Sequence, residues 1–390
     1  MTNNELINIL QCAISGNAYA LPVDWKTLLK IGELHKISSF IYEFAKANGS
    51  CPKDLLSSLK QLVALQFSED ETQKSEITKI TNEFEKNGIN AIIMKGTVMK
   101  EYYPRSDMRT MGDADILTLI KDEKEIKKIF NGFKYKEEHD IMVNTFSKGG
   151  VHFEIHKGLF SNNTTWNDLF INPNSNMYAW NRCVAYKNRK NIFKFDNELF
   201  YVFMIAHIAK HLLYGGGIGI RAFLDVYYFN KKFASKLNRE IVNRDLSQLN
   251  LNKFEEEVLK VSNYLFTKSE KERASESDLT KKFAKYIING GVFGSTENFI
   301  ANNTAMTEQG KVSPIKYLLK RAFPGKEEMT MRFPKMKNRA VLLPYYWIKR
   351  FAMYGFRQKN MIKAEIGTVK NVNQNKIQNN SALYTELGLK

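Results

Sequence analysis

The sequence has few cysteines, and their arrangement gives them no special role. Its three cysteines, Cys12, Cys51 and Cys183, lie far apart, and no Cys-x-x-Cys pair occurs. Disulfide-stabilised secreted domains are dense in cysteine, and structural zinc sites use closely spaced pairs. We therefore expect reduced thiols in a cytoplasmic protein.

Several segments that would define other classes of protein are also absent. No stretch reaches the roughly 18 consecutive apolar residues that a membrane-spanning helix needs. The first ten residues, MTNNELINIL, lack the basic region and apolar run of a signal peptide. The glycines at 215–219 do not form a P-loop, and His152-x-Glu154-x-His156 differs from the helical H-E-x-x-H zinc motif. These absences argue against a secreted protein, a P-loop nucleotidase and a zinc protease.

The sequence is rich in apolar residues and in positive charge. With 390 residues, 43% of them hydrophobic, it predicts two or three folding units. Its net charge of +17 indicates an anionic partner. Between Lys311 and Lys363 there are 14 lysines and arginines but two acids, and aromatic residues are interspersed among them. Three interpretations of residues 311–363 stay open, in decreasing order of preference: a packed helix with a solvated basic face, peripheral contact with the anionic inner face of a membrane, and nucleic-acid binding.

Hydrophobic periodicity predicts an α+β protein. Apolar residues at helical spacing predict an N-terminal helical region over 1–88, and residues 89–196 alternate strand and helix patterns. We expect the latter to form a small mixed β-sheet core. Helical patterns return in 197–300, the basic aromatic segment occupies 301–365, and 366–390 is predicted to be a flexible tail because it contains a stretch low in hydrophobic residues.

Two aspartates separated by one residue stand out in this core. Asp113 and Asp115 lie in Gly112-Asp113-Ala114-Asp115-Ile116-Leu117, and alternate residues of a strand share a face. Adjacent carboxylates repel, so the pair is costly unless a cation binds between them. Glu154 lies on the polar face of a second expected strand and is a candidate third ligand. Carboxylates of this kind hold Mg²⁺ together with substrate phosphates, and pairs of such ions promote phosphoryl and nucleotidyl transfer.

These residues resemble the polymerase-beta-like nucleotidyltransferase superfamily, in particular its poorly characterised bacterial branch. The resemblance is carried by the following segments: Lys95-Gly96, Tyr103-Pro104, Arg109, Gly112 to Leu117, and Glu154-Ile155-His156. It implies that Asp113, Asp115 and Glu154 bind two Mg²⁺ ions, with Mn²⁺ as an alternative. It also implies a nucleotidyltransferase core in which the nucleoside triphosphate (NTP), such as ATP, is contacted by Lys95, Gly96, Thr97, Arg109 and Gly112.

The resemblance implies a metal-dependent enzyme that moves a nucleoside monophosphate from an NTP to an acceptor hydroxyl and releases pyrophosphate. The acceptor is left open among a small molecule, a sugar, a peptide and a protein. The alternative is a catalytically degenerate nucleotide-binding protein whose basic C-terminal segment binds a membrane surface or nucleic acid.

Overall fold

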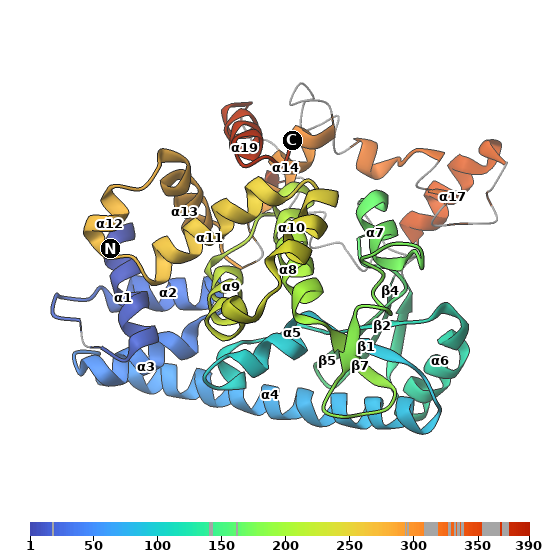
Figure 1. Cartoon of the computed structure of the whole chain (residues 1–390), viewed down its shortest axis with the longest axis horizontal. Helices are drawn as coiled ribbons and strands as arrows, with labels where there is room; N and C mark the ends of the chain where they lie inside the picture. The colour runs from blue at the N-terminus through green and yellow to red at the C-terminus, as the bar shows by residue number, and fades with distance from the viewer. Residues whose placement is uncertain are drawn as a thin grey trace. The chain divides into compact units, whose positions relative to one another are not determined.

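The protein forms two compact units. Figure 1 shows the helices and strands of the chain, coloured from the N-terminus to the C-terminus. Unit 1 comprises Met1–Ile208 and Gly219–Val292, and unit 2 comprises Ala209–Ile218 and Phe293–Lys390. The computed structural model describes residues 1–17, 19–139, 143–160, 163–292, 294, 296–307, 319–326, 329–330, 333, 336, 339–352, 367–368 and 374–390. The N-terminal helices, the β-sheet core and most of the helices after it thus belong to one unit, and the finer boundaries at 88 and 196 stay predictions.

Unit 1 is α+β, as predicted, with helices flanking one mixed sheet. Its helices are α1 (Asn3–Ser15), α2 (Trp25–His35), α3 (Ser38–Asn48), α4 (Lys53–Lys86), α5 (Lys95–Met99), α6 (Glu123–Gly132), α7 (Thr164–Ile171), α9 (Ile220–Phe233), α10 (Arg239–Gln248), α11 (Asn252–Phe266), α12 (Glu270–Ala274) and α13 (Asp278–Gly290). Helix α8 (Asn197–Tyr214) begins in unit 1 and ends in unit 2.

The sheet has seven strands in the order β3-β4-β5-β2-β1-β7-β6. Their bounds are β1 (Ala91–Ile93), β2 (Ala114–Thr118), β3 (Lys136–His139), β4 (Val143–Lys148), β5 (Val151–His156), β6 (Cys183–Ala185) and β7 (Ile192–Phe195). Strand β2 runs antiparallel to β1 and parallel to β5. Every residue of β1 and β2 is buried, as expected for the central strands of a sheet covered on both faces.

Helix α4 links the N-terminal helices to the sheet. It continues without a break from Lys53 to Lys86, and it contacts α3 at one part of its length and α6, β5 and β7 at another. Figure 1 shows it as the long blue helix running past both regions. Because the same helix contributes to both cores, residues 1–88 and the sheet are packed as one body.

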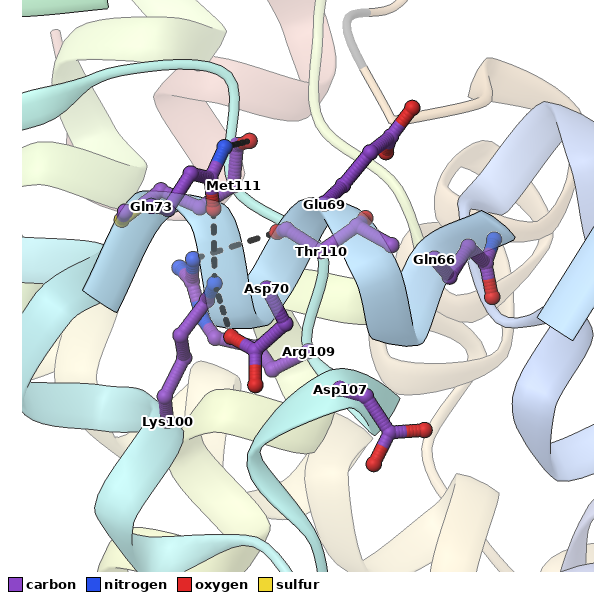
Figure 2. A pocket seen from close by; sticks show the side chains of 9 residues that line it. All are labelled: Gln66, Glu69, Asp70, Gln73, Lys100, Asp107, Arg109, Thr110 and Met111. Atoms are coloured by element: carbon purple, nitrogen blue, oxygen red, sulfur yellow. Dashed lines mark hydrogen bonds and ion pairs between the residues drawn. The ribbon is translucent and has the colours of Figure 1, made fainter. Parts of the chain in front are cut away.

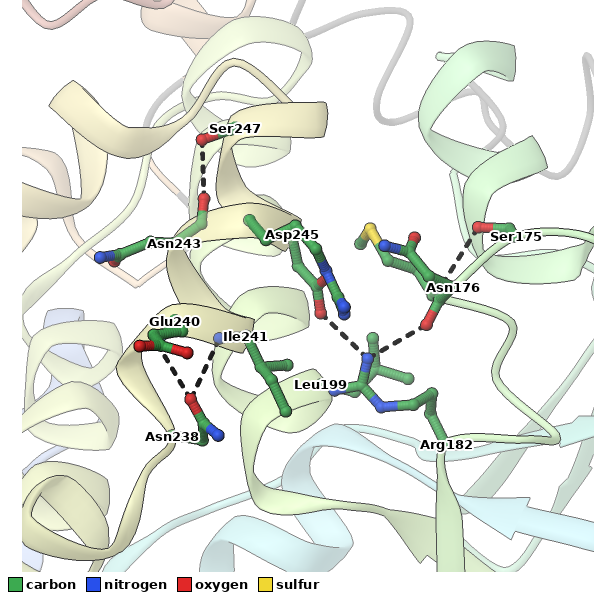
Figure 3. Close-up of polar contacts among 12 residues, drawn as sticks. Ser175, Asn176, Arg182, Leu199, Asn238, Glu240, Ile241, Asn243, Asp245 and Ser247 are labelled. Atoms are coloured by element: carbon green, nitrogen blue, oxygen red, sulfur yellow. Dashed lines mark hydrogen bonds and ion pairs between the residues drawn. The ribbon is translucent and has the colours of Figure 1, made fainter.

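An ion-pair network holds the β6–β7 hairpin against the helices that follow it. The Arg182 guanidinium donates to both carboxylate oxygens of Asp196, at 2.5 and 3.2 Å, and to the fully buried Asp245 of α10 at 3.0 Å. Figure 3 shows Arg182 pointing toward Asp245 and the Asn176 carbonyl. Asp196 also accepts from the Leu199 N–H at the start of α8. One arginine therefore ties the hairpin to two helices.

A buried histidine joins three helices of unit 1. His35 is fully buried, its Nε2 donates to the Ile288 carbonyl of α13 at 2.8 Å, and its Nδ1 accepts from the Ile220 N–H of α9 at 3.1 Å. Gly219 has no side chain with which to cap α9, so His35 satisfies one of the N–H groups that a helix leaves unpaired at its start. Only the neutral imidazole can make both hydrogen bonds.

This arrangement predicts acid sensitivity. Burial lowers the pKa of His35 to about 4, against the opposing effect of the hydrogen bond to Ile288. Above the usual histidine pKa of about 6.5 the ring is neutral in both states, and as the pH falls toward 4 the unfolded chain takes up a proton that the folded chain does not. Between pH 7 and pH 5, the free energy of unfolding of the wild type should therefore fall by about 2 kcal/mol more than that of His35→Gln.

Urea unfolding at the two pH values measures this difference. His152→Gln is the matched control because His152 is exposed, and it should keep the full pH dependence of the wild type. If the free energy of unfolding of His35→Gln depended on pH as that of the wild type does, His35 would not be the group that causes the acid sensitivity.

Unit 2 contains the described helices α14 (Thr296–Thr307), α17 (Leu343–Arg350) and α19 (Gln374–Glu386). Helix α19 packs against α14, and the buried Asn302 accepts hydrogen bonds from Asn380 and Tyr384. Residues 374–386, within the predicted flexible tail, thus form a helix that packs against α14. Ile377, Leu383 and Tyr384 are buried residues of α19, and Leu387, which follows the end of the helix, is buried too.

Candidate active site

The site begins where β1 ends and the chain turns into α5. The Met94 N–H donates to the Asp115 carbonyl at 3.1 Å, which sets the end of β1 beside the middle of β2. Lys95 follows with a φ of 45°, in the left-handed region that a non-glycine residue seldom adopts. Backbone strain of this kind persists where the surrounding structure imposes it, and it is common at functional sites. The turn directs the Lys95 side chain toward the acids of β2.

Parallel pairing of β2 with β5 brings the second and third predicted acids together. Asp115 lies directly opposite Glu154 in the register, so both side chains extend from the same face of the sheet. Among the residues that the structure describes, Asp115, Glu154 and His156 form a group whose ligand atoms lie within 4.8 Å of one another. Asp113, two residues before Asp115, lies just ahead of β2 and is not a member of that group.

The Asp115 carboxylate is held by hydrogen bonds from two side chains, the Lys95 ammonium and the His156 imidazole. Its Oδ1 accepts from Lys95 Nζ at 2.5 Å and from His156 Nε2 at 2.7 Å, and the same Nε2 lies 3.3 Å from a carboxylate oxygen of Glu154. Burial opposes ionisation, but the charge of Lys95 and the hydrogen bond from His156 hold the pKa of Asp115 well below its usual range. His156 thus orients two of the candidate ligands at once.

Asp113 shows the repulsion expected of adjacent carboxylates. Burial, together with the negative charges of Asp115 and Glu154, raises the pKa of Asp113 to about 6. Its ionised form is therefore destabilised by a negative potential that Lys95 and His156 do not fully neutralise. A cation bound among these acids would remove that penalty.

The donor set fits a hard divalent ion. Asp113, Asp115 and Glu154 offer carboxylate oxygens, the ligands that Mg²⁺ and Mn²⁺ prefer. Asp115 is almost fully buried, whereas the Glu154 side chain is 31% exposed. A site of this kind has one side fixed within the sheet and one side open to a substrate.

Sequence reasoning did not include His156 among the site residues. The signal was present, since His156 shares the polar face of β5 with Glu154. Its second ring nitrogen, Nδ1, is buried and has no hydrogen-bond partner among the described residues. The parallel register that places it against Asp115 could not be read from β5 alone.

Arg109, which is predicted to contact the NTP, is paired with a carboxylate of α9 in this structure. Its guanidinium makes a two-pronged ion pair with Asp225 of α9, at 3.0 and 2.8 Å, and the Tyr103 hydroxyl donates to the same carboxylate at 2.6 Å. Arg221, on the same helix, donates to the Thr110 carbonyl at 3.1 Å. These contacts attach the segment that leads into β2 to α9.

The three remaining predicted residues, Gly96, Thr97 and Gly112, differ in their surroundings. A Cβ on Gly96 would lie 2.7 Å from Arg109 Nη1 and 2.8 Å from Met111 Sδ, so a larger residue there would have to displace these two side chains. Thr97 makes a weak contact with the same Met111 sulfur, at 3.5 Å. Gly112 is exposed, and a Cβ there would meet nothing within 4 Å. Steric need therefore explains the glycine at 96 but not the one at 112.

A small polar pocket lies between α4 and the segment leading into β2. It is lined by Gln66, Glu69, Asp70, Gln73, Lys100, Asp107, Arg109, Thr110 and Met111. Figure 2 shows Lys100 and Asp70 pointing toward each other, and Lys100 Nζ donates to Asp70 at 2.6 Å and to Gln73 at 2.9 Å. Gln73 in turn donates to the Met111 carbonyl at 2.8 Å. This network attaches the same segment to α4, in addition to its attachment to α9.

The mixed sheet thus carries clustered acids on adjacent parallel strands, beside a strand–turn–helix unit, as the nucleotidyltransferase resemblance implied. Comparison with family models agrees: the model described as "uncharacterised nucleotidyltransferase" matches residues 22–267. The chain belongs to this family. No curated protein matches the chain in sequence.

Among solved structures, the chain is similar to the solution structure of the antibiotic-resistance factor ANT(2'')-Ia. The sequence identity is 12%, the match covers 46% of this chain and 92% of that chain, and the TM-score is 0.35.

Proposed function

We propose that the protein is a Mg²⁺-dependent nucleotidyltransferase that moves a nucleoside monophosphate from an NTP, such as ATP, to an acceptor hydroxyl. The observation that carries the proposal is the convergence of Asp115 and Glu154 from adjacent parallel strands, with Asp113 beside them and Lys95 reaching in from the β1–α5 turn. In the reaction the acceptor oxygen bonds to the α-phosphorus, the bond to the bridging oxygen breaks, and pyrophosphate leaves.

The three acids would hold the metal. Two bound ions would supply Lewis-acid activation of the acceptor oxygen and stabilise charge on the leaving pyrophosphate, with Mn²⁺ as an alternative to Mg²⁺. The Glu154 side chain is 31% exposed, whereas that of His156 beside it is 6% exposed. Glu154 is therefore accessible enough to accept the proton of the acceptor hydroxyl. Asp115, fixed by Lys95 and His156, would keep its position throughout.

Lys95 supplies the nearest positive charge for the phosphates. Its ammonium lies against Asp115 and its α5 backbone continues into Gly96 and Thr97, so the turn can present both a cation and N–H groups to an NTP. Gly112, which is exposed, is a further candidate contact. For Arg109 we propose a positioning role through Asp225 in place of a direct phosphate contact, because Asp225 and Tyr103 already engage this region.

The intact set of acids favours an enzyme over a degenerate nucleotide-binding protein. Three neighbouring carboxylates destabilise one another, as the raised pKa of Asp113 indicates. A protein without catalytic activity would have no need to keep all three. We propose a cytoplasmic protein whose acceptor is a sugar, another small molecule, a peptide or a protein. As a further partner of unit 2 we propose the surface of an anionic membrane, contacted peripherally, ahead of nucleic acid.

Incubation with each α-labelled NTP and Mg²⁺, with and without cell extract, tests this proposal. Label should pass from one or more NTPs to an acceptor identified by mass spectrometry, pyrophosphate should be released in equal amount, and EDTA should prevent both. Binding of Mg·NTP without transfer to any acceptor in the extract would contradict the enzyme and favour the degenerate alternative.

A further inference from the structure

Unit 2 exposes a cluster of large apolar side chains on and beside α17. Val341, Tyr345 and Ile348 are 91%, 59% and 71% exposed, and their spacing of four and three residues places them on one side of the helical segment. Single exposed apolar residues are ordinary on a protein surface, whereas a cluster of them indicates an interaction site.

The opposite side of α17 already has its own core. Tyr346 is buried with Met329 and Met336, and the partly buried side chains packed against this cluster are Phe333, Leu342, Leu343 and Trp347. The helix is therefore apolar on two sides. On the second side Tyr345 touches the ring of Tyr346, with centroids 5.1 Å apart, but more than half of the Tyr345 surface stays exposed. Val341, Tyr345 and Ile348 form that second side.

Residues 319–326 extend this exposed cluster. Phe323 stacks edge-on against Trp347 with ring centroids 5.2 Å apart, Trp347 Nε1 donates to the Pro324 carbonyl at 2.9 Å, and Arg350 donates to the Ala322 carbonyl at 3.1 Å. We define the basic aromatic surface as the exposed apolar residues of both segments with the cations between them: Leu319, Phe323, Val341, Tyr345, Ile348, Phe351, Lys320, Arg321, Lys326, Arg339, Lys349 and Arg350.

The charge of this surface is of one sign. The described ranges 319–326, 329–330, 333, 336 and 339–352 contain six lysines and arginines and no acid, whereas Glu327 and Glu328 fall in the gaps between them. Lys349 lies over the Phe333 ring at 5.8 Å and Arg350 over the Phe351 ring at 5.8 Å, so the cations border the aromatic residues. Exposed aromatic and aliphatic side chains bordered by cations are typical of segments that lie in the interface of an anionic bilayer.

The described helix of this surface is short compared with the thickness of a bilayer. Within the described residues, no helix has the length and apolarity to cross a membrane. Helix α17, with eight residues, is about 12 Å long, against the roughly 30 Å of a hydrocarbon core. Contact would therefore be peripheral.

We propose that the basic aromatic surface binds the surface of an anionic membrane, with Val341, Tyr345 and Ile348 inserted among the headgroups and the lysines and arginines paired with lipid phosphates. This proposal is independent of nucleotidyl transfer, so either can fail without the other. It selects one of the three interpretations that the sequence left open for residues 311–363, on the residues of this segment that the structure describes.

Flotation of the full chain with lipid vesicles tests the proposal. The protein should float with phosphatidylcholine vesicles that contain 30% phosphatidylglycerol, float at least tenfold less with pure phosphatidylcholine, and release at 0.5 M NaCl. Val341→Ser/Ile348→Ser and Lys326→Gln/Lys349→Gln should each weaken binding at least about tenfold, a change of ~1.4 kcal/mol. Leu65→Ser/Phe67→Ser, which replaces two exposed apolar residues of α4, is the matched control and should bind as the wild type does.

Three results would overturn the proposal. The first is equal flotation with charged and neutral vesicles, or none with either. The second is wild-type flotation of both the serine and the glutamine variants. The third is a different occupant: RNA or DNA bound in a manner that the glutamine variant abolishes while vesicles are not bound, or a dimer in light scattering that Val341→Ser/Ile348→Ser dissociates.

Discussion

Replacing Asp115 with asparagine should lower the rate of nucleotidyl transfer at least about a thousandfold, a loss of roughly 4 kcal/mol of transition-state stabilisation. Asparagine keeps the shape of the side chain but removes the charge on which Lys95 and His156 converge. The site would then lack the central one of three carboxylates that hold the metal. Single-turnover transfer of an α-labelled nucleotide measures the effect, and the affinity for Mg·NTP should fall in parallel.

Two comparisons separate this effect from a loss of fold. The far-ultraviolet circular dichroism of Asp115→Asn should match that of the wild type, because the backbone pairing of β2 with β1 and β5 does not involve the side chain. Asp168→Asn, at an exposed position of α7, should retain full activity. Transfer by Asp115→Asn within tenfold of the wild type would mean that the chemistry takes place elsewhere.

Replacing Arg109 with methionine should destabilise unit 1 by about 3–5 kcal/mol. Arg109 and Asp225 are both buried, and the substitution removes the two-pronged ion pair that Arg109 makes with the Asp225 carboxylate. Removing both charges in Arg109→Met/Asp225→Leu should restore most of the lost stability, because the uncompensated carboxylate is the source of the cost. Urea unfolding of the two single variants and the double variant measures this coupling.

Arg105→Met is the matched control for a nearby ion pair. Arg105 contacts Glu43 and Asp107, but its side chain is 46% exposed, so its loss should cost no more than about 1 kcal/mol. The same experiment decides between two roles of Arg109. A direct phosphate contact predicts a raised KM for the NTP with little change in stability, whereas a positioning role predicts the stability loss and its recovery in the double variant.

The sequence predicted the central part of the fold because local signals there are strong. The spacing of Asp113 and Asp115 and the alternation of polar and apolar residues in β5 both depend on neighbouring residues in the sequence. Helix α19 was missed because its few apolar residues are diluted by polar ones, and only packing on α14 makes them a buried face.

For the candidate site, sequence placed the acids but not their partners. Asp113 and Asp115 are close in sequence, and the family resemblance pointed to Glu154. The pairing of Asp115 with His156 depends on strand order, and that of Arg109 with Asp225 joins residues 116 positions apart. The periodicity of residues within one helix or strand does not indicate contacts between residues so far apart in the sequence.

The most direct test of the central claim is to locate the metal. Crystals grown with Mn²⁺ and an NTP analogue that cannot be cleaved between the α- and β-phosphates would show Mn²⁺ by anomalous scattering. We expect anomalous density bounded by the carboxylates of Asp113, Asp115 and Glu154, with the triphosphate against Lys95 and the β1–α5 turn. Nucleotide bound elsewhere, or bound there with Mn²⁺ absent from all three carboxylates, would contradict the central claim.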